Sequence, residues 1–343
     1  MLFTPDTSRP ASFDDLLDPA LAARLDALDI RSRKIFRGKL QGERRSKKRG
    51  QSVEFDDYRD YTPGDDLRHI DWNVYARFDR LFIKLFLEEE DLALHLAVDA
   101  SASMHAGRPT KAFTAARLAA ALAYIGLINN NRVSINVFGR AQAPGEGEPE
   151  ALPILSLQRL GDLRGRRHVP RVLQFLISSV WGPPGLGPSV APGKAANDFN
   201  SSLTALARSR TGKGVMVLLS DFLIAPEDGG YEPGLRALAA GSGAGGFDLW
   251  CLQILSPGEA DPQSELDQGL AGDLRLTDVE SGRASEVTMT AALIKQYKRR
   301  LEQYCDALHS FCLHRAIEHQ LVRSDAALDS LLLETLRRRG MLG

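Results

Sequence analysis

Short apolar runs that alternate with helical segments constrain the fold more than any other feature of this chain. Runs at 92–98, 132–138, 215–219 and 247–255 have the length of strands, and the first and third contain hardly a polar residue. Strands without polar alternation are buried on both faces, which is typical of a parallel sheet with helices on each side. The sequence therefore predicts an α/β fold, with a three-layer, Rossmann-like, mostly parallel sheet.

The remaining segments divide the chain into three predicted regions. Residues 1–80 are expected to form an N-terminal helical and extended segment, 81–280 the α/β domain, and 281–343 C-terminal helices packed on that domain. Further strands are expected at 81–90, 152–157 and, as an edge strand, 274–278. Helical periodicity covers 13–40, 111–130, 168–180, 199–210, 288–316 and 326–339.

Bulk composition excludes several classes of protein. The formal net charge is −1, so the whole chain is matched neither to nucleic acid nor to a membrane surface. Three cysteines without a CxxC spacing fit plain thiols in a reducing compartment. The first residues lack a basic and then apolar leader, and the runs at 92–98 and 215–219 are shorter than the ~20 residues of a spanning helix. These features favour a cytoplasmic protein with no membrane partner.

One local charge asymmetry supports an alternative function. Residues 31–49 contain ten Lys or Arg and one acid, whereas 54–71 contain seven acids and two arginines. A basic run of this kind can bind nucleic acid. It has little aromatic interleaving and an acidic block follows it, so we expect a solvated or internally paired face and regard nucleic acid as an unlikely partner.

Two carboxylates follow the most apolar strands. The run at 92–98 leads into Asp99, and the run at 215–219 leads through a serine into Asp221. Ligands of open parallel sheets bind beyond the carboxyl ends of the strands, so neighbouring strands would bring both carboxylates into one crevice. Ser101 and Ser103 follow Asp99 at alternating positions and face the same side of a turning loop. These hard oxygen donors predict a site for Mg²⁺ or Mn²⁺ rather than zinc.

The spacing Asp99-Ala-Ser101-Ala-Ser103 resembles the metal-ion-dependent adhesion site of the von Willebrand factor A family. The resemblance implies a von Willebrand A-like fold in which the serines contact the metal and the two aspartates act partly through water. It also implies a threonine ligand on a third loop, and Asn197 stands at the expected place, with Asp198, Asn200 and Ser201 as nearby substitutes.

A second resemblance covers most of the chain beyond residue 40. The segment 44–104, with Asp57-Tyr58-Arg59, Pro63-Gly64-Asp65-Asp66 and Ile70-Asp71-Trp72, is similar to the domain of unknown function 58 family of bacterial proteins. This resemblance implies a partnership with AAA+ ATPases of the MoxR type and a role in assembling or activating other proteins. Within the segment, the spacing of Trp72, Tyr75 and Phe78 predicts core residues.

We therefore expect a non-enzymatic, metal-dependent protein-binding module, in which an acidic side chain of the partner completes the metal shell. The partner would be a MoxR-type AAA+ ATPase or its client. A metal-dependent phosphatase or esterase is the alternative, although no general base is evident. A Ser103/His105 catalytic pair is disfavoured, because sequence neighbours seldom have the required geometry.

Overall fold

The structure is a computed structural model, which describes residues 9–32, 55–65, 67, 70–86, 92–140, 157–182, 198–211, 213–240, 247–263, 273–277, 284–288 and 290–343. It contains two compact units. The larger combines Met1–Arg37 with Leu92–Gly343, and Gly38–Asp91 form the smaller unit, inserted between these two segments. The predicted segment 1–80 is thus shared between both units.

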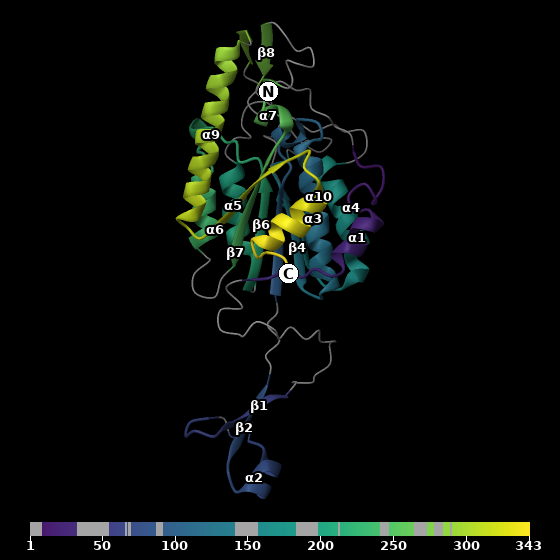
Figure 1. The fold of residues 1–343 in the computed structure, drawn as a ribbon, viewed down its shortest axis with the longest axis vertical. Coiled ribbons are helices and arrows are strands. Elements are labelled where there is room, and N and C mark those ends of the chain that lie inside the picture. Colours follow the sequence, from purple (N-terminus) through teal and green to yellow (C-terminus); the bar gives the residue numbers. More distant parts are fainter. Residues whose placement is uncertain are drawn as a thin grey trace, which may run out of the picture. The chain divides into compact units, whose positions relative to one another are not determined.

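A six-stranded sheet forms the centre of the larger unit (Figure 1). Its strands lie in the order β10 (Glu318–Arg323), β7 (Asp248–Leu255), β6 (Lys213–Ser220), β3 (Leu92–Asp99), β4 (Arg132–Phe138) and β5 (Gln158–Leu163). All neighbouring pairs are parallel except β4 and β5. The predicted α/β class and the mostly parallel sheet are confirmed.

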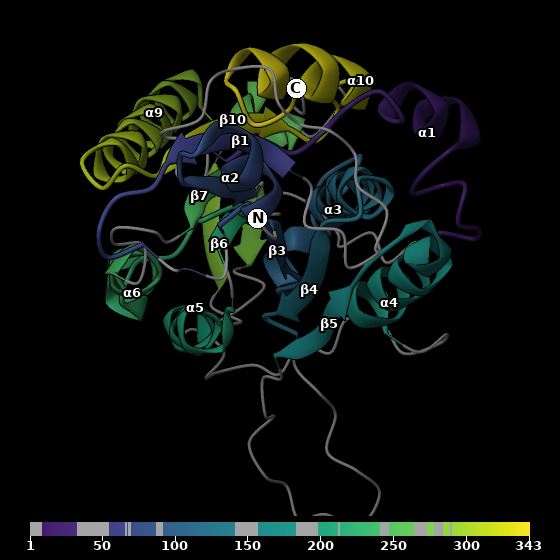
Figure 2. The ribbon, with the colours of Figure 1, turned by 90° about the horizontal axis from the view of Figure 1, so that it is seen from below.

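Helices cover both faces of this sheet (Figure 2). One face packs against α1 (Pro19–Leu25), α3 (Lys111–Ile128), α4 (Val169–Trp181), α10 (Leu328–Ser330) and the π-helix η6 (Leu331–Leu336). The other packs against α5 (Asp198–Ser209), α6 (Glu232–Ala240) and α9 (Ala291–Leu313).

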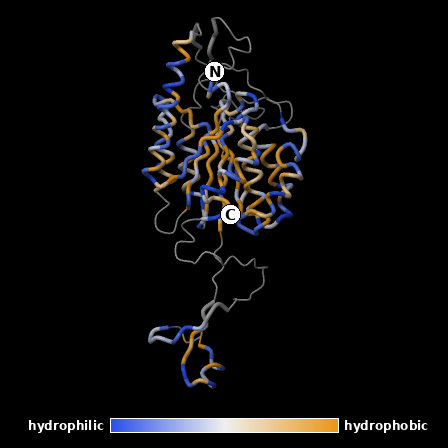
Figure 3. The backbone as a smooth tube through the Cα atoms, in the orientation of Figure 1, coloured by the Kyte–Doolittle hydropathy of each residue, from blue (hydrophilic) through white to orange (hydrophobic). Residues whose placement is uncertain are grey.

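The strand residues alternate between these two cores. Leu94, Leu96 and Val98 of β3 belong to the first, whereas Ala93 and Ala97 belong to the second. When the backbone is coloured by hydropathy, apolar strands lie at the centre of the larger unit, between helices of mixed character (Figure 3). Among the described residues, α3 is the one helix long and apolar enough to span a membrane, and 83% of that stretch is buried inside the protein.

Several predicted boundaries were wrong. The helix expected at 13–40 ends at Leu25, because Asp26 caps it and Ile30 then forms a β-bridge with Leu342; residues 33–40 lie outside the described part. The strand expected at 152–157 lies, except for Leu157, outside the described residues; the strand described in this region is β5 at Gln158–Leu163. The strand expected at 274–278 is β8 (Asp273–Thr277), which pairs with β9 (Ala284–Thr288) in a separate hairpin rather than with the sheet edge.

That edge is formed instead by β10, from the region expected to supply only helices. Its sequence, EHQLVR, alternates polar and apolar residues. A strand covered on one side only has this alternation, which is why the search for apolar runs missed it.

The smaller unit consists of the antiparallel pair β1 (Phe55–Asp60) and β2 (Phe82–Phe86), joined through the helix α2 (Trp72–Phe78). The prediction that Trp72, Tyr75 and Phe78 are core residues was wrong: their exposed fractions are 61%, 40% and 67%. A two-stranded unit has too little apolar area to bury a helix face. The guanidinium of Arg59 contacts the carboxylate of Asp65 at 2.9 Å.

Candidate metal site

The sheet reverses its winding between β3 and β6. If the six strands of this sheet are numbered 1 to 6 along the chain, their order in the sheet, read from β5 to β10, is 3-2-1-4-5-6. In this doubly wound order, ligands bind at the carboxyl ends of the strands where the order reverses. Asp99 is the last residue of β3, and Asp221 directly follows β6. The register Val98–Leu219 brings these ends side by side. The predicted convergence of Asp99 and Asp221 is therefore found at the switch point of the sheet.

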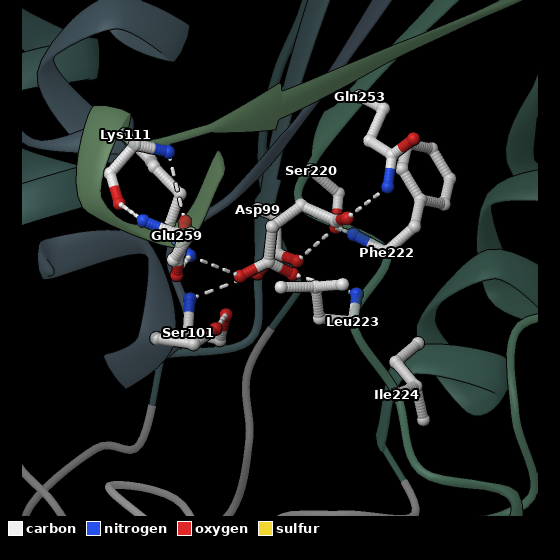
Figure 4. Close-up of polar contacts among 12 residues, drawn as sticks. Asp99, Ser101, Lys111, Ser220, Phe222, Leu223, Ile224, Gln253 and Glu259 are labelled. Carbon is white, nitrogen blue, oxygen red and sulfur yellow. Dashed lines mark hydrogen bonds and ion pairs between the residues drawn. The ribbon is translucent and has the colours of Figure 1, made fainter. Parts of the chain in front are cut away.

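Uncharged donors hold the carboxylate of Asp99. Its Oδ1 accepts a hydrogen bond from the backbone N–H of Ser101 at 2.9 Å, and its Oδ2 accepts one from the Ser220 hydroxyl at 2.6 Å (Figure 4). Burial raises the pKa of Asp99 to about 6, and the neighbouring charge of Asp221 adds to this rise. A cation at this position would relieve both effects.

The two predicted serines lie together in the loop after β3. The Oγ atoms of Ser101 and Ser103 are 3.1 Å apart, and Ser103 lies in the short helix η2 (Ala102–His105). Gly139, which follows β4, lines the other side of the loop with a φ of +81°. A Cβ there would lie 2.7 Å from Asp99 Oδ1 and 3.0 Å from the Ser101 nitrogen, so only glycine fits without a shift.

Asp221 is held differently, by a charged group. Its Oδ2 accepts a hydrogen bond from the Lys111 ammonium at 2.7 Å, and its Oδ1 accepts one from the N–H of Leu223 at 3.1 Å. Phe222, between them, has a φ of +57°, which is rare for a residue with a Cβ. Such strain is often found at functional sites.

Lys111 and Glu259 were not predicted as part of the site. Lys111 is the first residue of α3 and is 0% exposed, and its ammonium also donates to Glu259 Oε1 at 2.5 Å. Burial alone would lower the pKa of Lys111, but the charges of Asp221 and Glu259 outweigh it and raise the pKa. Figure 4 shows Lys111 and Glu259 on one side of Asp99 and Gln253 on the other. A lysine in the apolar helix 111–130 was the available sequence signal.

Glu259 is fixed in turn by the short helix α7 (Pro257–Ala260). Its Oε2 accepts a hydrogen bond from the N–H of Ser256 at 2.9 Å, while the Ser256 hydroxyl accepts one from the Glu259 N–H. This reciprocal arrangement is a capping box. The capping box keeps Glu259, the second acidic partner of Lys111, in place.

The helix α9 supports the Asp221 loop with two tyrosines that sequence reasoning also missed. The hydroxyl of Tyr304 donates to the carbonyl of Phe222 at 2.6 Å and accepts from the N–H of Ile224 at 3.3 Å. The hydroxyl of Tyr297 donates to the carbonyl of Glu259 at 3.0 Å. From β7, Gln253 donates to the carbonyl of Asp221 at 3.1 Å.

Asn197, predicted in place of the family's threonine, lies outside the described residues, and so does the side chain of Asp198. Asn200, a suggested substitute, has a structural role: its amide donates to the Gly230 carbonyl at 2.9 Å and its Oδ1 accepts from Gly234 N–H at 2.7 Å. Ser201 is exposed on α5. The basic run 31–49 is described only at its first two residues.

A Ser103/His105 pair receives no support from the structure. Of the bonds among described residues, the one made by the Ser103 hydroxyl goes to Ser101. His105 is buried with its ring edge-on to Trp181, and burial lowers its pKa to about 4.

The charge of the buried groups around Asp99 and Asp221 fits a divalent metal ion. Asp99, Asp221, Glu259 and Lys111 carry a formal charge of −2 when all four are ionised, and all four are buried. Buried charge is costly unless it is compensated, and one divalent cation would balance it. Within the described part of the chain, no group of three or more His, Cys, Asp or Glu side chains is arranged around a common metal position. A metal here would therefore depend on the hydroxyls of Ser101 and Ser103, which are hard donors suited to Mg²⁺.

Comparison with known proteins places the chain among relatives without an assigned activity. An uncharacterized protein of Mycobacterium bovis and two of Mycobacterium tuberculosis strains are each 27% identical to it over 287 residues, which cover 83% of this chain and 79% of each relative. Residues 57–305 match the family described as "Protein of unknown function DUF58". Because this match covers most of the sequence, the chain belongs to that family.

Proposed function

We propose that the protein is a non-enzymatic protein-binding module with a von Willebrand A-like domain, whose metal ion binds an acidic side chain of its partner. The observation that carries the proposal is the meeting of Asp99, Ser101, Ser103 and Asp221 at the switch point between β3 and β6. The strand order and the antiparallel β5 support the von Willebrand A-like architecture.

Ser101 and Ser103 would hold Mg²⁺ or Mn²⁺ through their hydroxyls, with Asp99 and Asp221 supplying negative charge. When bound, the metal supplies an electrophilic centre that a carboxylate can ligate. Two neutral hydroxyls and two carboxylates leave an octahedral shell incomplete, which leaves room for that ligand.

The proposed partner is a MoxR-type AAA+ ATPase or a client of one, in the assembly or activation of other proteins. This part rests on the resemblance of the segment 44–104 described in the sequence analysis. A cytoplasmic location is proposed with it.

The test is binding between the purified full chain and a MoxR-type ATPase from the same organism, measured by biolayer interferometry in Mg²⁺ and in EDTA. We expect binding in Mg²⁺ that EDTA weakens and that Asp99→Ala abolishes. Asp329→Ala, which removes an exposed carboxylate on α10, is the matched control and leaves binding unchanged. Binding that persists in EDTA and in Asp99→Ala would show that the metal site is not the contact.

A further inference from the structure

Lys111 has an unusual position for a lysine. It is fully buried and is the first residue of α3, where the helix dipole disfavours positive charge. A cation is retained at such a place only with anionic partners, and the structure supplies Asp221 and Glu259. The ammonium is therefore part of the site rather than a surface charge.

The ammonium occupies an oxygen that a metal ion would also use. Asp221 Oδ2 is bonded to Lys111, and Oδ1 to the Leu223 N–H. Glu259 cannot move toward the metal loop without breaking the capping box at Ser256. Asp221 and Glu259 thus fix the position of the Lys111 ammonium from two sides.

We propose that Lys111 is a resident cation that competes with the divalent metal for Asp221 and so sets the metal affinity of the site. This inference rests on the proposed metal site. A positive charge in contact with a metal ligand repels the metal and occupies one of its donor atoms. Metal binding is then weak in the isolated chain and becomes strong when an acidic partner adds negative charge, which couples the two binding events.

The decisive variant is Lys111→Met with Glu259→Gln. It removes the ammonium and its second carboxylate together, so the formal charge of the four-residue cluster stays at −2 while Asp221 Oδ2 is released. The probe is Mn²⁺ alone, titrated into the full chain with free Mn²⁺ read by electron paramagnetic resonance. We expect the Kd for Mn²⁺ to fall about tenfold, because the net charge is unchanged and the released Oδ2 of Asp221 becomes a donor atom for the metal. Adding Asp99→Ala must abolish this gain.

Two further variants ensure that the test does not depend on whether the double variant folds. Glu259→Gln alone keeps the ammonium and removes one negative charge, so we expect the Kd for Mn²⁺ to rise. Lys298→Met removes a lysine that pairs with Asp261 on the surface at 2.7 Å, and it leaves the Kd unchanged. Circular dichroism confirms that each variant is folded before it is titrated.

The outcomes separate this inference from the proposed function. If the natural chain binds Mn²⁺ through Asp99 and the double variant binds equally well, Lys111 does not compete and the inference is overturned while the metal site stands. If only the double variant binds, and does so through Asp99, the inference holds, and the partner-binding experiment in Mg²⁺ and EDTA decides separately whether the natural chain depends on a metal ion. If no variant binds, both are overturned.

Discussion

The two carboxylates at the switch point end neighbouring strands, yet the protein holds them in opposite ways. Asp99 accepts hydrogen bonds from the uncharged groups of Ser101 and Ser220. Asp221 is bound by the buried ammonium of Lys111. The first carboxylate keeps a raised pKa, whereas the second has its own counter-ion.

This difference shows how one site can combine a strong need for positive charge with a stable fold. If both carboxylates had a lysine, the loop after β3 would have no use for a metal ion. If neither did, two buried negative charges would repel each other without relief. The asymmetry is supported by long-range contacts on the Asp221 side, from α7, α9 and β7.

The largest effect is expected from removing the ammonium that binds Asp221. Lys111→Met leaves Asp221 and Glu259 buried without their cation, which should lower the free energy of unfolding by about 3–5 kcal/mol. Urea denaturation without metal measures it. The added change Glu259→Gln should recover part of the loss, because Asp221 is then the one carboxylate that has lost its cation. A loss comparable to that of a surface pair, about 1 kcal/mol or less, would show that Lys111 does not hold Asp221.

The second effect is a pH dependence of the free energy of unfolding. It concerns His319, which contacts one of the residues that hold Asp221. His319 on β10 contacts Gln253 at 3.2 Å, and burial, with the charges of His309 and Arg339, lowers its pKa to about 4. The unfolded chain, with a pKa near 6.5, binds this proton first. The stability due to neutral His319 is therefore complete above about pH 6.5 and is lost as pH falls toward 4.

The measurement compares the unfolding free energies of the natural chain and His319→Gln at pH 7 and pH 4.5. The natural chain should lose up to about 3 kcal/mol more than the variant on acidification. His314→Gln, at an exposed position nearby, serves as the control and should follow the natural chain. Equal acid sensitivity in all three chains would contradict the role of His319.

A smaller effect is expected on the Asp99 side, at Gly139. Gly139→Ala combines a φ of +81° with a Cβ pressed against Asp99. Gly165→Ala has nearly the same φ, +83°, and nothing within 4 Å of the new Cβ. The difference in unfolding free energy between them isolates the steric contact, and overpacking of this kind costs about 1–3 kcal/mol. Equal destabilisation would show that the loop after β3 can move aside.

The smallest effect tests whether the loop after β3 and the loop after β6 open independently of each other. Tyr304→Phe removes the hydroxyl that contacts Phe222 and Ile224, at a cost of about 1 kcal/mol. Hydrogen exchange should quicken at the amides of Leu223 and Ile224 and stay unchanged at Ser101. Tyr297→Phe, which acts on Glu259 instead, is the control. Faster exchange at Ser101 would mean that the two loops open as one.

The sequence was sufficient for the centre of the fold but not for its supports. The runs that became β3 and β6 are buried on both faces, so their composition alone identified the strands and the residues that end them. Lys111 and Glu259 are separated by 148 positions, and no local pattern indicates that they meet. The strand β10 was missed because an edge strand alternates polar and apolar residues.

The same limits explain the error at α2. Periodic aromatic spacing predicts buried residues, but burial depends on what lies opposite, and the described residues of the small inserted unit offer one hairpin beside α2. The spacing of Trp72, Tyr75 and Phe78 predicted core residues, whereas α2 leaves all three exposed.

The place of Asp99 in its strand has a mechanical consequence for the site. Asp99 is the last of the eight residues of β3. Because β3 has parallel neighbours on both sides, β4 and β6, a pull along it would load two ladders of hydrogen bonds in shear and at the same time. Strands loaded in this way resist sliding. Displacing Asp99 along the strand would break both ladders at once, so its place at the end of β3 is held from two sides.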